Sequence, residues 1–175
     1  DPLTHRSIIE GNREGRLITE GVYHVLTAEA GVKVELNGFH IVNGYAAGQA
    51  AIQHGAGLLA YDGADVTLLN CIFEDNSAVS GAAVYAEGNA KVTMRNCVVN
   101  NNTNTDAASA EAVVYCANNA NLDLEHVSFL NNEGAAPANL GTSSFALNNT
   151  GGNSAFGMAT TGAEGASNFA NPAND

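Results

Sequence analysis

The chain has 175 residues, a length that fits one domain with a single modest core. Ala, Asn and Gly number 30, 23 and 19, Trp is absent and 14% of the residues are charged, which argues against long surface helices rich in Glu and Lys. The formal net charge of -12 repels nucleic-acid phosphates and anionic lipid headgroups. No apolar run approaches the roughly 18 residues of a membrane-spanning helix. We therefore expect no nucleic-acid partner and no membrane insertion by this segment.

Residues 1–30 contain two strand-like pieces, at residues 6–12 and 22–30, that match the later repeats only loosely. We expect them to form an irregular first rung that precedes the regular ones. The sequence begins at Asp1-Pro2, with neither an initiator Met nor a charged and apolar leader. This start predicts a mature chain or an excised fragment from which any targeting signal has been removed.

A long motif occurs four times between Gly31 and Asn132, without a gap inside any copy. The copies are residues 31–44, 63–76, 89–102 and 119–132. They start 32, 26 and 30 residues apart. Within each copy, apolar residues such as Val66 and Leu68 alternate with mostly polar ones. A period of two indicates strands, with one set of side chains buried and the other facing solvent.

The alternation slips by one residue in the middle of each copy, because the apolar positions on either side of the slip are three residues apart. The residues at the slip are Gly38, Asn70, Asn96 and His126. Gly and Asn adopt left-handed backbone conformations more readily than other residues, and every copy also begins and ends with one of these two types. We therefore expect a bend at this position in every copy.

A shorter strand-like motif precedes each later long motif. Its copies are residues 57–63, 83–89 and 113–119, with residues 143–149 as a fourth expected copy. A unit of this length cannot bury its apolar face alone, whereas units stacked in register bury one continuous core. The sequence therefore predicts an all-β, single-stranded parallel β-helix of about four to six rungs. The regular rungs span about residues 31–132, a last rung 133–149, and an irregular tail or cap rich in Gly, Ala and Asn 150–175.

Asn residues at aligned corners are expected to form a hydrogen-bonded ladder along the axis of such a solenoid, which accounts for the high Asn content. A β-sandwich built of hairpins is the alternative interpretation. Repeats spaced 26 to 32 residues apart, with matched apolar columns, fit a sandwich poorly, because its strands follow one another through short turns.

Three short segments resemble the FxxN and GGA(I/L/V) repeats of bacterial polymorphic outer-membrane and autotransporter-type surface proteins. They are residues 73–76 (FEDN), 129–132 (FLNN) and 81–85 (GAAVY). Residues 36–41 are similar to the opening rung of right-handed β-helix repeats in large secreted bacterial proteins, a family that also looks like the pectate-lyase superfamily. The resemblance covers about residues 30–132. It implies a right-handed β-helix that is secreted or exposed at a bacterial surface, associated with the outer membrane.

The sequence departs from this repeat pattern at two places. Val99 stands where the FxxN repeat has Phe, and Glu111 and Ala112 replace the pair of glycines. The implied fold is unaffected by these changes. The same repeat occurs in adhesins and in sugar-cleaving enzymes, so the resemblance implies a fold and leaves the activity open.

A lyase of β-helical fold needs Lys or Arg to abstract a proton next to a carboxylate that another cation neutralises. The cationic residues are Arg6, Arg13, Arg16, Lys33, Lys91 and Arg95. The aligned copies place Lys91 between Asp65 and Asn121. They also place Arg95 beside Glu125, so we interpret both cations as members of surface pairs between neighbouring rungs. We therefore predict no catalytic residue, with a polysaccharide lyase or hydrolase as the alternative.

The acidic residues fall on different columns, so no tight carboxylate pair for glycoside hydrolysis is expected. These residues are Asp62, Asp65, Glu74, Asp75 and Glu87. The five His residues also occupy unrelated columns and show no HxH or HExxH spacing. We predict no metal site and no cofactor, with calcium on scattered carboxylates as the alternative.

The three cysteines, Cys71, Cys97 and Cys116, lack the CxxC spacing of metal or redox sites. Cys71 and Cys97 share an inward column one rung apart. Their Cα atoms are close enough for a disulfide, but parallel stacking seldom gives the torsion that a disulfide needs. We expect free, buried thiols that pack as small hydrophobic groups.

One mainly aromatic column is a candidate ligand-binding stripe, and its members are Leu59, Tyr85, Tyr115 and Phe145. Its side chains point to the opposite face of the strand from those of the neighbouring columns, which begin at Leu58 and Ala60. If those neighbours face inward, the aromatic rings face solvent, where sugar rings or a partner can stack on them. If the phase is reversed, the rings belong to the core, and the sequence does not decide between the two.

Length differences between the repeats gather at one corner of the unit, in residues 45–56, 77–82, 103–112 and 133–142. Loops on one face of a solenoid often form its binding surface. The candidate residues of this loop face are Tyr45, Gln53, His54, Asp106 and Glu111.

These features favour a non-catalytic β-helix module, secreted or on a cell surface, that serves as an adhesive, matrix-forming or filament-forming segment. An uncovered solenoid end is an open sheet edge, so head-to-tail self-association is expected. A polysaccharide or another surface protein is the expected partner. Two alternatives stay open: a polysaccharide lyase or hydrolase with a groove beside the loops, and a carbohydrate-binding module without turnover.

Overall fold

The computed structural model describes residues 7–12, 22–47, 53–106, 112–133, 136–139 and 145–148. This part of the chain forms short strands and no helix. The strands are β1 (Ser7–Glu10), β2 (Leu26–Ala28), β3 (Lys33–Asn37), β4 (Phe39–Val42), β5 (Tyr45–Ala46), β6 (Leu58–Ala60), β7 (Asp65–Leu69), β8 (Ile72–Glu74), β9 (Ser77–Ala78), β10 (Val84–Ala86), β11 (Lys91–Arg95), β12 (Val98–Asn100), β13 (Thr103–Asn104), β14 (Ala112–Cys116), β15 (Asn121–Glu125), β16 (Ser128–Leu130), β17 (Ala136–Asn139) and β18 (Phe145–Asn148).

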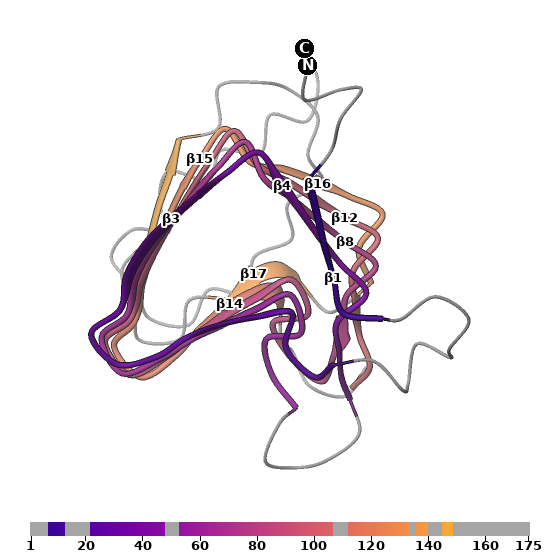
Figure 1. The fold of residues 1–175 in the computed structure, drawn as a ribbon, viewed down its shortest axis with the longest axis horizontal. Coiled ribbons are helices and arrows are strands. Elements are labelled where there is room, and N and C mark those ends of the chain that lie inside the picture. The colour runs from indigo at the N-terminus through magenta and orange to yellow at the C-terminus, as the bar shows by residue number, and fades with distance from the viewer. Residues whose placement is uncertain are drawn as a thin grey trace.

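Successive turns of the chain contribute strands to four parallel sheets. The strand orders are β1-β4-β8-β12-β16, β17-β14-β10-β6-β2, β18-β15-β11-β7-β3 and β13-β9-β5. Because neighbours in a sheet lie one turn apart along the chain, the turns stack into a solenoid, and Figure 1 shows them nearly superimposed. The predicted all-β parallel β-helix is confirmed, with about four turns from β2 to β16, preceded by β1 and followed by β17 and β18.

The strand register confirms the predicted alignment of the long motif. Lys33 pairs with Asp65, Asp65 with Lys91, and Lys91 with Asn121, so the offsets of 32, 26 and 30 residues hold in space. The short motif also pairs in register through β6, β10 and β14.

The expectation that residues 143–149 form a fourth copy of the short motif is wrong. Phe145 lies in β18, which pairs with β15 of the long motif, opposite Leu122. The strand next to β14 is β17 instead, with Asn139 opposite Tyr115. Chain order explains the difference, because β17 is the first strand after β16 and meets the open edge of β14 before β18 does.

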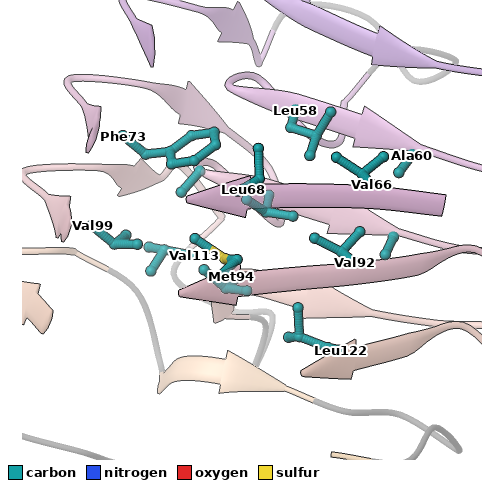
Figure 2. Packing of buried hydrophobic residues seen from close by; sticks show 14 of the residues in the cluster. Leu58, Ala60, Val66, Leu68, Phe73, Val92, Met94, Val99, Val113 and Leu122 are labelled. Atoms are coloured by element: carbon teal, nitrogen blue, oxygen red, sulfur yellow. The ribbon is translucent and has the colours of Figure 1, made fainter. Parts of the chain in front are cut away.

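Inward side chains from successive turns form one core, in which residues pack on their counterparts one turn away (Figure 2). Val66, Leu68 and Phe73 of the second full turn are fully buried. Val34 and Leu36, the counterparts of Val66 and Leu68 in the first turn, are only partly buried, because β3 has a described strand neighbour on one side only. Among the described side chains, the core is therefore least covered at the first turn.

A left-handed residue marks the predicted bend in each copy of the long motif. The angle φ is 78° at Gly38, 53° at Asn70, 52° at Asn96 and 52° at His126. The bend separates the two strands of each long motif, such as β7 and β8, and re-aims the chain into the next sheet. His126 adopts this conformation although it is costly for most residues that carry a Cβ atom.

Asn76, Asn102 and Asn132 form the predicted ladder at the corner after β8, β12 and β16. Asn76 Nδ2 donates to Asn102 Oδ1, and Asn102 Nδ2 donates to Asn132 Oδ1, both at 3.0 Å. The same two oxygens accept the backbone N–H groups of Asn76 and Asn102 at 3.1 and 2.9 Å. In the first turn Gly44 takes this position, and its N–H donates to Asn76 Oδ1 at 3.0 Å. Each amide thus satisfies polar groups of neighbouring turns and fixes their spacing.

Candidate functional site

The predicted loop face lies where the turns leave β5, β9 and β13 and return in β6, β10 and β14, the corner at which their paths differ most (Figure 1). Tyr45 lies in β5, Gln53 and His54 come shortly before β6, and Asp106 is exposed after β13. Glu111 lies outside the described residues. Four of the five candidate residues therefore belong to the described part of this corner.

Gln53 and His54 pack against the following turn. The Gln53 carbonyl accepts the N–H of Val79 at 2.8 Å, and His54 forms a β-bridge with Ser80. His54 Nδ1 also lies 2.6 Å from Ser80 Oγ. Because Ser80 is fully buried, this pair holds the loop in place and does not present a nucleophile to solvent.

His24 secures the same loop from the other side. Its Nδ1 lies 3.1 Å from the carbonyl oxygen of Gly55. Burial lowers the pKa of His24 below its usual value, against the opposing effect of this hydrogen bond. The ring is therefore neutral at pH 7 and serves as an anchor for the loop.

The aromatic column faces outward, but part of it is covered. Leu58 and Ala60 are 2% and 0% exposed, so the side chain between them, Leu59, points away from the core. Tyr85 and Tyr115 stack with ring centroids 5.3 Å apart, and His54 stacks on Tyr85 at 4.6 Å. Tyr85 is consequently only 7% exposed.

Two parts of the stripe hypothesis change. Its outward phase agrees with the structure, but Phe145 does not belong to the column, because β18 pairs with β15. The ring of Tyr85 lies between those of His54 and Tyr115 and offers little surface to a sugar. The stacking of His54 on Tyr85 is not predictable from the aligned repeats, because His54 lies in a loop whose length differs between turns.

A polar groove crosses three turns at the start of the loop face. Its volume is about 360 Å³, and its lining residues are Asn43, Tyr45, Asp75, Asn76, Ser77, Asn101 and Thr103. Tyr45, Ser77 and Thr103 begin β5, β9 and β13, pair in register and are half-buried. Among these residues, the sequence predicts only Tyr45 as a candidate for ligand binding.

Asn43, Asp75 and Asn101 line the groove two residues before these strands begin, and each has a left-handed backbone, with φ of 61°, 55° and 54°. Asn101 Nδ2 donates to Asp75 Oδ1, and Asn43 Nδ2 donates to Glu10 Oε1 at 3.0 Å. These bonds engage neither the amide oxygens of Asn43 and Asn101 nor the second carboxylate oxygen of Asp75. The signal in the sequence was the polar residue just before the end of each long motif, which continues at Asn131.

Charged side chains pair across turns on the outer surface. Arg95 Nε lies 2.8 Å from Glu125 Oε2, as the alignment predicted. Lys91 does lie in register between Asp65 and Asn121, but Asp65 forms its ion pair with Lys33, at 3.3 Å. Such exposed pairs each stabilise a fold by about 0 to 1 kcal/mol.

Cys71, Cys97 and Cys116 are buried thiols that form no disulfide, as expected. A hydrogen bond from the Cys97 thiol lowers the pKa of Cys71 to about 7, with burial acting in the opposite direction. The same contact raises the pKa of Cys97, and burial raises it further. Cys71 is therefore the first of this pair to lose its proton.

The described residues include no group of three or more His, Cys, Asp or Glu side chains arranged to hold a metal ion. In the same part of the chain, no helix has the length and apolar character needed to cross a membrane.

The family model described as right handed beta helix region matches residues 4–156. This range includes the repeated turns, the aromatic column and the polar groove. No curated protein and no solved structure matches the chain. The stacked parallel turns agree with the family match and with the fold that the sequence repeats predict. The chain therefore belongs to the right handed beta helix family.

Proposed function

We propose that this chain is a non-catalytic, extracellular or cell-surface β-helix module that builds filaments or adhesive layers through head-to-tail contact between copies. The observation that carries this proposal is the distribution of exposed large hydrophobic side chains. In the described part of the chain they lie in the strands and loops at the two ends of the solenoid: Ile8 56%, Val22 49%, Tyr23 43%, Val32 41% and Leu130 45% exposed. Apolar surface concentrated in this way favours association at the ends over association along the sides.

The two ends are also complementary in backbone geometry. On one end β1, β2 and β3 have a described neighbour on one side only, and on the other end the same holds for β16, β17 and β18. Because every ladder is parallel, a second copy displaced along the axis presents its first edge to the last edge of its neighbour in the direction that pairing requires. Such a contact is heterologous and continues into an open filament.

The core columns support the same arrangement. Ile9 of β1 pairs with Ile41, and its column continues through Phe73 and Val99 to Phe129 of β16. In a head-to-tail pair, Ile9 of one copy follows Phe129 of the other and prolongs this apolar column. Burial of the exposed Ile8 and Leu130 side chains would then contribute to association.

Sedimentation velocity over a range of concentrations tests the assembly. We expect the wild-type chain to associate as concentration rises, and both Ile8→Lys and Leu130→Lys to weaken association because each places a charge on one end. An equimolar mixture of the two variants should form dimers without filaments, because each retains the end that the other has lost. Ile72→Lys, in the same column as Ile8 but in mid-solenoid, is the matched control.

A wild-type chain that stays monomeric at high concentration would contradict the proposed assembly. Equal association of the wild type and the three variants would also contradict it.

Incubation with acidic and neutral polysaccharides in the presence of calcium tests the non-catalytic part of the proposal. We expect the size distribution of every polymer to stay unchanged. Shorter products would overturn this part in favour of a lyase or hydrolase. Loss of that cleavage in Lys91→Ala would then identify the lyase alternative.

A further inference from the structure

We propose that Cys71 and Cys97 form a site of thiol oxidation, at which hydrogen peroxide joins the second and third turns of the solenoid through a disulfide bond. Cys71 lies in the core between β7 and β8, and Cys97 occupies the same place between β11 and β12. Neither residue belongs to the exposed apolar set at the ends of the solenoid, so oxidation of the pair and self-association of the ends fail independently.

The backbone places the two cysteines in register, one turn apart. The Val98 N–H donates to the Cys71 carbonyl, and the Asn70 N–H donates to the Arg95 carbonyl, both at 2.9 Å. The parallel ladder therefore continues through the bend. Neighbouring parallel strands are about 4.8 Å apart, which falls within the range of about 4.4 to 6.8 Å that Cα atoms span in disulfides. A bond between the two residues can thus form while the turns stay stacked.

The two side chains also take the same position within their turns. Cys71 Sγ lies 3.3 Å from the carbonyl oxygen of Leu69, and Cys97 Sγ lies 3.3 Å from that of Arg95, in each case two residues earlier in the chain. The Cys97 thiol is hydrogen-bonded to the sulfur of Cys71. Because the sulfur atoms already interact, rotation about the two Cα–Cβ bonds is the movement that brings them to bonding distance.

The pair divides the two roles that oxidation requires. The hydrogen bond from the Cys97 thiol lowers the pKa of Cys71 to about 7, against the opposing effect of burial. Backbone hydrogen bonds of Gly38, Phe39 and Leu69 lower this pKa further. In the described part of the chain, Cys97 is therefore the titratable side chain that acts on Cys71. The thiolate is the reactive form of cysteine, so Cys71 attacks the oxidant and Cys97 keeps its proton for the second step.

The reaction has two steps. The Cys71 thiolate attacks one oxygen of hydrogen peroxide, so an S–O bond forms, the O–O bond breaks and hydroxide leaves. The sulfur of Cys97 then displaces the hydroxyl group of this sulfenic acid, and that group leaves with the Cys97 proton as water. The two sulfur atoms together lose two electrons, which reduce the peroxide to hydroxide and water.

Burial selects a small oxidant. Cys71 and Cys97 are 0% and 1% exposed, and thiol oxidation depends on access as well as on thiolate character. A bulky disulfide such as oxidised glutathione is therefore excluded, whereas hydrogen peroxide is close to water in size. Each cysteine directly follows an exposed corner residue, Asn70 or Asn96, so the pair lies just beneath the surface.

Cys116 provides a comparison within the same chain. It is as deeply buried as Cys71, but its register neighbour in the preceding turn is Ala86. Stacking thus places a methyl group at the position where Cys97 has the thiol of Cys71. We expect peroxide to leave Cys116 in its reduced form.

Mass spectrometry of the folded chain after exposure to hydrogen peroxide tests the proposal. Cleavage after Arg95 and Glu111 separates the three cysteines into different peptides. We expect a disulfide that joins the Cys71 and Cys97 peptides within one chain. Dithiothreitol should reduce it readily, because parallel stacking does not favour the torsion of an unstrained disulfide. Absence of this disulfide overturns the proposal, as does a disulfide to Cys116 or between two chains.

The unfolded chain is the control for register. In urea, loop closure favours the disulfide between Cys97 and Cys116, because it encloses the shortest of the three possible loops. We expect oxidation of the folded chain to favour Cys71 with Cys97 instead. The same distribution of disulfides in the folded and unfolded chains would refute selection of the pair by the stacked turns.

Cys97→Ser separates the two steps. The hydroxyl group keeps a hydrogen-bond donor beside Cys71, but it cannot form a disulfide. The sulfenic acid of Cys71 should therefore persist and react with dimedone, whereas the wild type should give little of this adduct. Cys116→Ala, the matched control, should form the disulfide as fast as the wild type. Equal dimedone labelling of the wild type and Cys97→Ser would contradict the role of Cys97.

The pH profile identifies the attacking sulfur. The rate of disulfide formation should rise with pH and reach half of its maximum at about pH 7, where Cys71 loses its proton. A midpoint at the pKa of about 8.5 that an ordinary thiol has would count against Cys71 as the attacking thiolate.

Discussion

Asn102 joins three turns of the solenoid through one side chain. Its Oδ1 accepts from Asn76, while its Nδ2 donates to Asn132 Oδ1 and to the carbonyl oxygen of Phe73 at 3.0 Å. Asn102 is fully buried, so water cannot replace these partners. An apolar residue at this position leaves several polar groups of the second turn without a hydrogen bond.

Asn102→Ala should lower the free energy of unfolding by about 3 kcal/mol or more, since each buried group left unsatisfied costs about 1 to 3 kcal/mol. Urea denaturation followed by circular dichroism measures the change. Asn37→Ala, which removes an exposed amide oxygen from the edge strand β3, is the control and should stay within about 0.5 kcal/mol of the wild type. Equal effects of the two substitutions would show that the ladder contributes nothing beyond an exposed hydrogen bond.

The thiol pair predicts a pH dependence at the same scale. In Cys97→Ala the pKa of Cys71 should rise from about 7, because the hydrogen bond that stabilises its thiolate is lost while burial remains. Cys97→Ser keeps a donor and should hold the pKa lower. Thiolate ultraviolet absorbance against pH, measured in a Cys116→Ala background, follows the titration. An unmoved Cys71 pKa in Cys97→Ala would refute the assignment of the thiol hydrogen bond as its cause.

At the scale of strands, Gly57 sets how closely two turns approach. A Cβ atom at Gly57 would lie 2.4 Å from the carbonyl oxygen of Ala83 in the next turn and 2.8 Å from Phe73 Cδ1. The Ala83 carbonyl belongs to the backbone and cannot move aside as a flexible side chain can. The two turns would therefore have to separate near β6. Gly63 differs, because nothing lies within 4 Å of its added Cβ and only its φ of +80° resists substitution.

Gly57→Ala should therefore lower stability by about 3 kcal/mol through overpacking. Gly63→Ala, the control, should cost about 1 kcal/mol through backbone strain alone. Thermal denaturation of the two variants and the wild type compares the effects. A melting temperature of Gly57→Ala equal to or above that of Gly63→Ala would contradict the prediction that the turns are too close at Gly57 to accept a Cβ atom.

The strands of the regular turns were predictable because their signals are local and repeated. Alternation around Val66 and Leu68 predicts the inward face, and alignment of four copies predicts the register that places Lys91 between Asp65 and Asn121. The position of Phe145 was not predictable in this way. Its segment resembles the short motif in residue types, whereas its pairing depends on β17, which the sequence pattern did not reveal.

The candidate site was predictable only in part. Loop-length variation pointed to the corner where the groove lies and to Tyr45 in its lining, but it could not show that His54 stacks on Tyr85. The groove was missed because its shape depends on side-chain size in a column of separate turns and on left-handed backbone at Asp75 and its counterparts. Both are properties of stacked turns that no single motif displays.

For the whole molecule, stability is a sum over turns and their contacts. Strands β7 and β11 have neighbours on both sides, whereas β2 and β3 each have one neighbour among the described strands. Hydrogen exchange at low protein concentration should therefore show slowest exchange in β7 and β11 and faster exchange in β2 and β3. Mass spectrometry of peptic fragments resolves these segments. Uniform protection along the chain would contradict unfolding from the ends.

The direction of the hydrogen bonds gives the solenoid an uneven mechanical response. In all four sheets, and in the Asn ladder, these bonds join one turn to the next and so run along the axis. Tension that pulls the two ends apart loads these hydrogen bonds a few at a time, so the turns detach one after another. A force applied across the axis must instead slide a whole turn against its neighbour and is opposed by all four ladders at once. A filament of such modules would be tough against sideways shear while its outermost turns yield first under stretch.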